Sequence, residues 1–158
     1  MEATIRRAEE RDVPAMLNLV RELAAFEKEP DAVTVTEEEM RDAGFGPNAV
    51  WWGWVAEDAD GLLGIAICYE RYSTWRGRVG YLEDIVVTER ARGQRIGERL
   101  LKECAAEAAR RKYHHLTWQV LDWNEGAIRF YKRFDAEVTS EWLNGRLYHE
   151  QLKRIASE

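Results

Sequence analysis

Two adjacent carboxylates stand in the middle of a strongly apolar stretch of the sequence. The run Val79–Val87 carries Glu83 and Asp84 among valine, isoleucine, leucine and tyrosine side chains. A buried carboxylate is costly unless a cation or a wet cleft compensates its charge. One interpretation is an ion pair with an arginine in the core wall, and the other is a site in which a carboxylate takes a proton from a substrate. Because successive strand residues point to opposite faces, we expect the two carboxylates to have different roles.

A glycine-containing turn follows this strand and leads into an amphipathic stretch. It reads RGQRIG over Arg92–Gly97. The unpaired N–H groups at the start of a helix, and the positive end of its dipole, form a site for an anion. Arg92 and Arg95 add positive charge, and the glycines allow a ligand to approach the backbone closely. The spacing matches neither a P-loop nor a dinucleotide fingerprint, and a plain strand-to-helix turn is the alternative.

The histidines and cysteines do not suggest a metal centre. The histidines His114, His115 and His149 form no HxxxH or HExxH pair, so we expect no metal. The cysteines Cys68 and Cys104 share no CxxC spacing and lie in apolar patterns, so we expect buried free thiols.

The elements that must position these residues alternate in type. Asp12 can cap a first helix with Pro14 in its opening turn, Thr36–Glu39 has the form of a capping box, and Asn144-Gly145 is a hairpin signal. The predicted helices begin after Asp12, after Thr36, near Ile96 and after Asn124, the last covering Glu125–Arg133. The predicted strands are Thr4–Arg7, Trp51–Ala56, Leu62–Tyr72, Val79–Val87, His115–Val120, Glu137–Trp142 and Arg146–Lys153. This order predicts a mixed α/β fold.

Size and charge limit the functions to consider. The chain has 158 residues, 46% of them hydrophobic and 33% charged, which fits a single soluble domain over residues 1–158. The formal net charge of -6 argues against nucleic acid as a partner and suits a cationic small molecule. No apolar run is long enough to span a bilayer, so we expect no membrane partner and a cytoplasmic location.

The turn and several further blocks resemble the GNAT superfamily of N-acetyltransferases. The turn is similar to the family's pyrophosphate-binding pattern Gln/Arg-x-x-Gly-x-Gly/Ala, with Arg95 where the first motif glycine is expected. The blocks that resemble the spermidine/spermine (diamine) acetyltransferase branch run in order along the chain: Ala25–Glu27, Asp42–Gly46, Trp75, Tyr81–Asp84, Trp123–Glu125 and Phe130–Arg133. The resemblance implies a central, mostly antiparallel mixed sheet of about six to seven strands, flanked by about four helices.

The resemblance also implies a reaction. Acetyl-CoA would be the co-substrate, Glu83 the base that takes a proton from a primary ammonium, and Tyr131 the acid that protonates the departing thiolate. From the residues alone, the alternative for Tyr131 is an aromatic of the helix that packs beside Phe130 and Ile128. The cofactor-binding residues would be Ile85, Val86, Val87, Arg92, Gly93, Gln94, Arg95, Ile96, Gly97, Glu98, Asn124, Ala127 and Tyr131.

The expected acceptor is a small cationic amine, namely a polyamine, a diamine or a thialysine-like amino acid. Glu27, Glu83 and Asp84 can place negative charge along a groove, and Phe26 and Trp75 can pack on methylene groups or bind the cation. A solvated position at the end of a helix is the alternative for Glu27. The alternative hypotheses for the function are acetylation of protein amino groups or of another small amine, and a non-catalytic CoA-binding sensor.

A cluster of tryptophans suggests that two copies of the chain associate. Trp51, Trp52 and Trp54 crowd one strand, and adjacent residues cannot share one face of it. At least one of the three therefore needs cover outside a single core layer. Members of the resembled family are usually homodimers, so we expect this strand to contribute to a homodimer contact.

Overall fold

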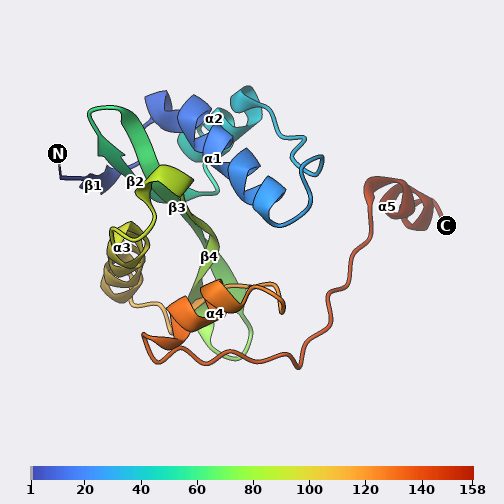
Figure 1. Cartoon of the computed structure of the whole chain (residues 1–158). Helices are drawn as coiled ribbons and strands as arrows, with labels where there is room; N and C mark the ends of the chain where they lie inside the picture. The colour runs from blue at the N-terminus through green and yellow to red at the C-terminus, as the bar shows by residue number, and fades with distance from the viewer. Residues whose placement is uncertain (1) are drawn as a thin grey trace. The chain divides into compact units, whose positions relative to one another are not determined.

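The computed structural model describes residues 2–158 (Figure 1). The chain forms two compact units, Met1–Gln119 and Val120–Glu158. The strands are β1 (Thr4–Arg7), β2 (Trp52–Asp58), β3 (Gly61–Ser73), β4 (Gly77–Val87) and β5 (Leu116–Thr117). The α-helices are α1 (Val13–Phe26), α2 (Glu37–Phe45), α3 (Ile96–Arg110), α4 (Glu125–Lys132) and α5 (His149–Ala156).

The first unit is built on one mixed sheet with the strand order β1-β2-β3-β4-β5. The first four strands are antiparallel neighbours and form a meander, and β5 lies parallel to β4. The fold class is therefore as predicted. The sheet formed by residues 2–158 has five strands, fewer than the six to seven expected.

Helices cover both faces of this sheet. In Figure 1, α1 and α2 lie on one side of it and α3 on the other. Met16 and Leu17 of α1 pack in one buried cluster with Val55, Ile65 and Ile67 of β2 and β3. The amphipathic stretch forms α3, and its buried face consists of Ile96, Leu100, Leu101, Cys104 and Ala108. Alternation along the strands thus supplies two apolar layers.

The starts of α1 and α2 differ in how they are capped. In α2 the capping box is confirmed, because Thr36 Oγ1 accepts from the Glu39 N–H at 3.1 Å and the Glu39 carboxylate accepts from the Thr36 N–H at 2.8 Å. Asp12 precedes α1, but the predicted cap contact is wrong. Its carboxylate instead accepts from the Arg6 guanidinium at 2.7 and 2.8 Å and from the Glu9 N–H at 2.7 Å.

The tryptophans near β2 find cover within the first unit. Trp51 Nε1 donates to the Met40 carbonyl at 3.1 Å, so this ring is held on α2. On the strand itself, the Arg7 guanidinium carbon lies 5.1 Å from the centroid of the Trp52 ring and 5.3 Å from that of Trp54. Cys68 and Cys104 are buried free thiols, as predicted.

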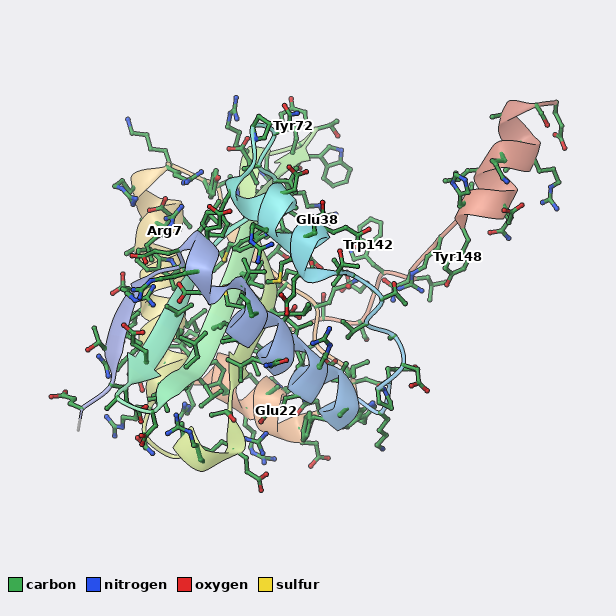
Figure 2. The ribbon with its side chains drawn as sticks, turned by 90° about the horizontal axis from the view of Figure 1, so that it is seen from above. Arg7, Glu22, Glu38, Tyr72, Trp142 and Tyr148 are labelled. Carbon is green, nitrogen blue, oxygen red and sulfur yellow. The ribbon has the colours of Figure 1, made fainter. Side chains whose placement is uncertain are left out.

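The predicted hairpin across Asn144-Gly145 is wrong. Residues 136–148 form no helix or strand, and α5 begins where the second strand was expected. The sequence Glu150–Ala156 is rich in strong helix formers, and the Gln151 side chain accepts from the Tyr148 N–H at 2.8 Å to close the first turn. Local helix preference therefore overrides the turn signal. Figure 2 labels Trp142 on the extended segment and Tyr148 at the start of α5.

The strand predicted over His115–Val120 is also shorter in the structure, where β5 covers only Leu116–Thr117. Among residues 2–158, no helix combines the length and the apolar character needed to cross a membrane.

Candidate active site

A β-bulge interrupts β4 where the two carboxylates stand. Ile67 of β3 is opposite Asp84, but the next residue, Cys68, is opposite Leu82, so Glu83 is the extra residue. A bulge bends the strand and re-aims side chains. The strict alternation that would send Glu83 and Asp84 to opposite faces therefore does not hold here.

Two tyrosines define the surroundings of Glu83. Tyr69 Oη donates to the Glu83 carboxylate at 2.8 Å, and the Tyr69 ring stacks on the Tyr81 ring with 5.1 Å between centroids. Burial, with the nearby negative charge of Glu83, raises the pKa of both phenols, so Tyr69 keeps the proton that it donates. Tyr69 was not among the residues predicted from the sequence, although the register of the β3–β4 hairpin places it beside Tyr81.

Asp84 is the more strongly perturbed of the two carboxylates. Burial raises its pKa to about 6, and the negative charges of Glu83 and Glu27 act in the same direction. Burial also raises the pKa of Glu27, which follows α1. The structure therefore brings the three predicted acidic residues into one electrostatic neighbourhood. Within residues 2–158 no arginine or lysine forms an ion pair with Glu83 or Asp84, which removes the interpretation as a core ion pair.

A contact between α1 and the end of β4 holds this neighbourhood together. The Glu22 carboxylate, labelled in Figure 2, accepts from Thr88 Oγ1 at 3.0 Å and from the Glu89 N–H at 3.1 Å. Both donors directly follow β4, so the contact positions the C-terminal end of α1. Phe26 lies there, half-exposed, with the Arg92 guanidinium carbon 5.8 Å from the centroid of its ring. Nothing in the sequence pattern singled out Glu22.

The turn before α3 presents a row of unpaired backbone donors. Within residues 2–158 the backbone N–H groups from Gly93 to Gly97 have no hydrogen-bond partner, and the next helical bond runs from the Arg99 N–H to the Arg95 carbonyl. Arg95 adopts the left-handed conformation with φ of 59° directly before α3, and Gly93 has φ of 80°. Arg95 thus takes the backbone conformation that a glycine would adopt at this position.

The other residues of the turn are compatible with an anion. Arg92 and Arg95 are exposed, as is Gln94, whose amide lies 3.5 Å from the Arg90 carbonyl. Glu98 is the one acidic residue in the first turn of α3, and its carboxylate is paired with Lys102 at 2.9 Å. The unpaired donors and the arginines therefore suit a diphosphate.

The end of β4 offers a free backbone edge. On one side, Ile85, Val86 and Val87 pair with β3. On the other side β5 pairs only with Gly80 and Tyr81, so no strand of residues 2–158 covers the second edge from Ile85 onward. Exposed edge groups of this kind can pair with an extended ligand that carries amides.

The second unit carries the remaining predicted residues. Asn124 caps α4 as predicted, because its side-chain oxygen accepts from the Ala127 N–H at 3.2 Å. Tyr131 is 6% exposed, and its ring centroid lies 5.2 Å from that of Phe130. In the first unit, Trp75 is exposed in the turn between β3 and β4, at the opposite end of β4 from Ile85. Residues 2–158 contain no group of three or more His, Cys, Asp or Glu residues placed to hold a metal ion.

Comparisons with known proteins agree with this fold. The model of the acetyltransferase (GNAT) family matches residues 13–136. Thialysine N-epsilon-acetyltransferase of Mus musculus is 38% identical to the chain, over 96% of this chain and 96% of the mouse protein. Spermidine/spermine N(1)-acetyltransferase-like protein 1 of Homo sapiens is 34% identical, over 98% of this chain and 24% of the human protein.

A solved structure gives the same result for the fold. An integron cassette protein from the mobile metagenome of V. cholerae superposes with a TM-score of 0.79 at 22% identity, covering 100% of this chain and 99% of the other. The fold and the sequence relatives define an acyl-CoA-dependent N-acetyltransferase. The chain belongs to the acetyltransferase (GNAT) family, in its diamine acetyltransferase branch.

Proposed function

We propose that the protein transfers an acetyl group from acetyl-CoA to a primary amine of a small cationic acceptor. The acceptor would be a polyamine, a diamine or a thialysine-like amino acid, which attacks the thioester directly in a ternary complex. The observation that carries the proposal is the group Glu27, Glu83 and Asp84, which forms no ion pair among residues 2–158. A cluster of acidic residues without an ion-pair partner, in which burial raises the pKa of Asp84, favours an external cation.

The coenzyme would bind through the turn and the edge described above. The N–H groups from Gly93 to Gly97 and the side chains of Arg92 and Arg95 would hold the diphosphate. The free edge of Ile85–Val87 would hydrogen-bond the pantetheine amides. Asn124, whose side-chain oxygen already caps α4, would contribute with Ala127 a second contact to the coenzyme.

The two carboxylates of the bulge would divide the work on the amine. A primary ammonium has a pKa near 10 and is no nucleophile until it loses a proton. Asp84, ionised at neutral pH although its pKa is raised, would hold the ammonium with Glu27. Glu83 is exposed and would take the proton and pass it to solvent. Tyr69, which donates to Glu83, would fix the orientation of that carboxylate.

The free amine would then attack the thioester carbonyl. A backbone N–H near Ile85 would stabilise the tetrahedral oxyanion, and Tyr131 would protonate the thiolate as the carbon–sulfur bond breaks. Acid and base would each contribute about 10²–10⁴-fold, and alignment of the two bound substrates would supply most of the remainder.

We further propose that residues 1–158 act as one acetyltransferase domain, in a cytoplasmic homodimer. The two buried free thiols suit a reducing compartment. Large apolar side chains on the extended segment 136–148 support the association of two copies, since Trp142 is 85% exposed and Leu143 is 96% exposed.

An assay of CoA release with a panel of amines tests the proposed reaction. We expect turnover with small primary amines, and a fall of about 10²-fold or more in kcat for Tyr131→Phe with unchanged affinity for CoA. Phe130→Leu is the matched control, because it alters the neighbouring aromatic and keeps the phenol. Unchanged kcat in Tyr131→Phe would show that another group protonates the thiolate.

A further inference from the structure

Arg71 extends a positive charge toward the acidic end of the proposed acceptor site. It lies on β3 directly opposite Val79 of β4. Its guanidinium carbon is 5.6 Å from the centroid of the Tyr81 ring, which is two residues closer to Glu83. The side chain therefore reaches back along the sheet, and its charge partly offsets the rise in the pKa of Tyr81 that burial causes.

Among residues 2–158, no carboxylate forms an ion pair with Arg71. Glu70, the adjacent residue, pairs with Arg78 instead. Arg71 is exposed and its position is defined by the face of the Tyr81 ring, so its planar fork of donors is available to a ligand. The ligand group that matches such a fork is a carboxylate or a phosphate.

Opposite charges lie at the two ends of the surface that the Tyr69 and Tyr81 rings form on β3 and β4. Glu83 and Asp84 stand at one end, Arg71 stands at the other, and the stacked rings of Tyr69 and Tyr81 lie between them. Tyr81 and Glu83 are two residues apart on β4, directly before and at the bulge. An amino acid with an amine at the end of its side chain carries its ammonium and its α-carboxylate at opposite ends, and this order of charges matches the acidic residues and Arg71.

We propose that the acceptor is an α-amino acid with a terminal amine, and that Arg71 binds its α-carboxylate. The inference rests on the proposed acetyl transfer and selects one acceptor class within it. A polyamine, which is cationic at both ends, would place an ammonium beside Arg71 and be repelled. Arg71 is thus a residue that determines specificity, remote from the reacting atoms.

The first test needs only the wild-type protein and three acceptors. L-Lysine, L-lysinamide and cadaverine share the terminal amine, but only lysine carries the carboxylate. We expect kcat/KM for lysine to exceed that for lysinamide by about 10-fold or more, because a charge-assisted pair is lost in the amide. Equal values for the two acceptors would overturn the inference, whereas no acetylation of any acceptor would overturn the proposed function and this inference with it.

A charge-removing variant assigns the preference to Arg71. In Arg71→Gln the ratio of kcat/KM for lysine over lysinamide should fall to near one, mainly through a higher KM for lysine. Turnover of cadaverine reports whether the variant is folded. Arg11→Gln is the matched control, because Arg11 is exposed and pairs with Glu9, away from the acceptor site. If Arg71→Gln kept the wild-type ratio of kcat/KM for lysine over lysinamide, Arg71 would not be the residue that binds the carboxylate.

Discussion

Asp84 lowers the stability of the fold at neutral pH. Its pKa is about 6 in the folded protein and 3.8 as the ordinary value, so the folded state binds more protons between these limits. The free energy of unfolding must therefore fall as the pH rises from about 4 to about 6, and it stays lower above that range. Such a cost is typical of residues kept for function.

Replacing the Asp84 carboxylate should stabilise the fold and lower the catalytic activity. We expect Asp84→Asn to raise the free energy of unfolding at pH 7 by on the order of 2 kcal/mol, and to have little effect near pH 4. Urea denaturation at the two pH values measures this, and kcat/KM for amines should fall in the same variant. An equal change in stability at both pH values would show that the charge of Asp84 is not the cause.

Some residues of the site could be predicted from the sequence, and others could not. Glu83 and Asp84 are conspicuous because carboxylates are costly in an apolar strand, and Arg92–Gly97 because glycines and arginines mark a turn. No motif or spacing in the sequence indicates a role for Tyr69, Glu22 or Arg71. Their positions depend on strand register and on a contact between α1 and the end of β4, neither of which local spacing reveals.

At the scale of elements, the turn before α3 stores backbone strain at Arg95. A non-glycine residue with φ of 59° costs roughly 1 kcal/mol. In Arg95→Gly the relief of strain is offset by the greater freedom of the unfolded chain, so we expect stability within about 1 kcal/mol of wild type. Arg95→Ile should lose about 1–2 kcal/mol, because a branched side chain disfavours this conformation.

These two variants control for each other, since both remove the same positive charge. Urea denaturation compares their free energies of unfolding directly. Equal stability of the glycine and isoleucine variants would mean that residue 95 does not need the left-handed conformation.

Helices and antiparallel strands of the first unit followed the sequence pattern, whereas the end of the chain did not. Periodicity marked α3 and the meander correctly because each has one continuous buried face. The prediction of a hairpin at Asn144-Gly145 is wrong because a turn signal does not establish that the flanking residues pair. Here Glu150–Ala156 has strong helix propensity, and α5 forms instead.

At the scale of the whole molecule, the exposed apolar residues of segment 136–148 predict an association. We expect the wild type to be a dimer in light scattering after size exclusion, and the double variant Trp142→Ser, Leu143→Ser to shift toward monomer. Trp75→Ser is the matched control, because Trp75 is 84% exposed but lies in the turn between β3 and β4. A monomeric wild type would refute the proposed homodimer, and a dimeric double variant would exclude this segment as the contact.

The proposed function depends on a coenzyme held by the N–H groups and arginines before α3. Isothermal titration calorimetry with CoA tests this most directly, comparing wild type with Arg92→Gln. We predict one site per chain with a dissociation constant of about 1–100 μM, weaker at high salt and weakened about 10-fold by the substitution. No binding heat with the wild type, or full affinity in Arg92→Gln, would contradict the proposed coenzyme site.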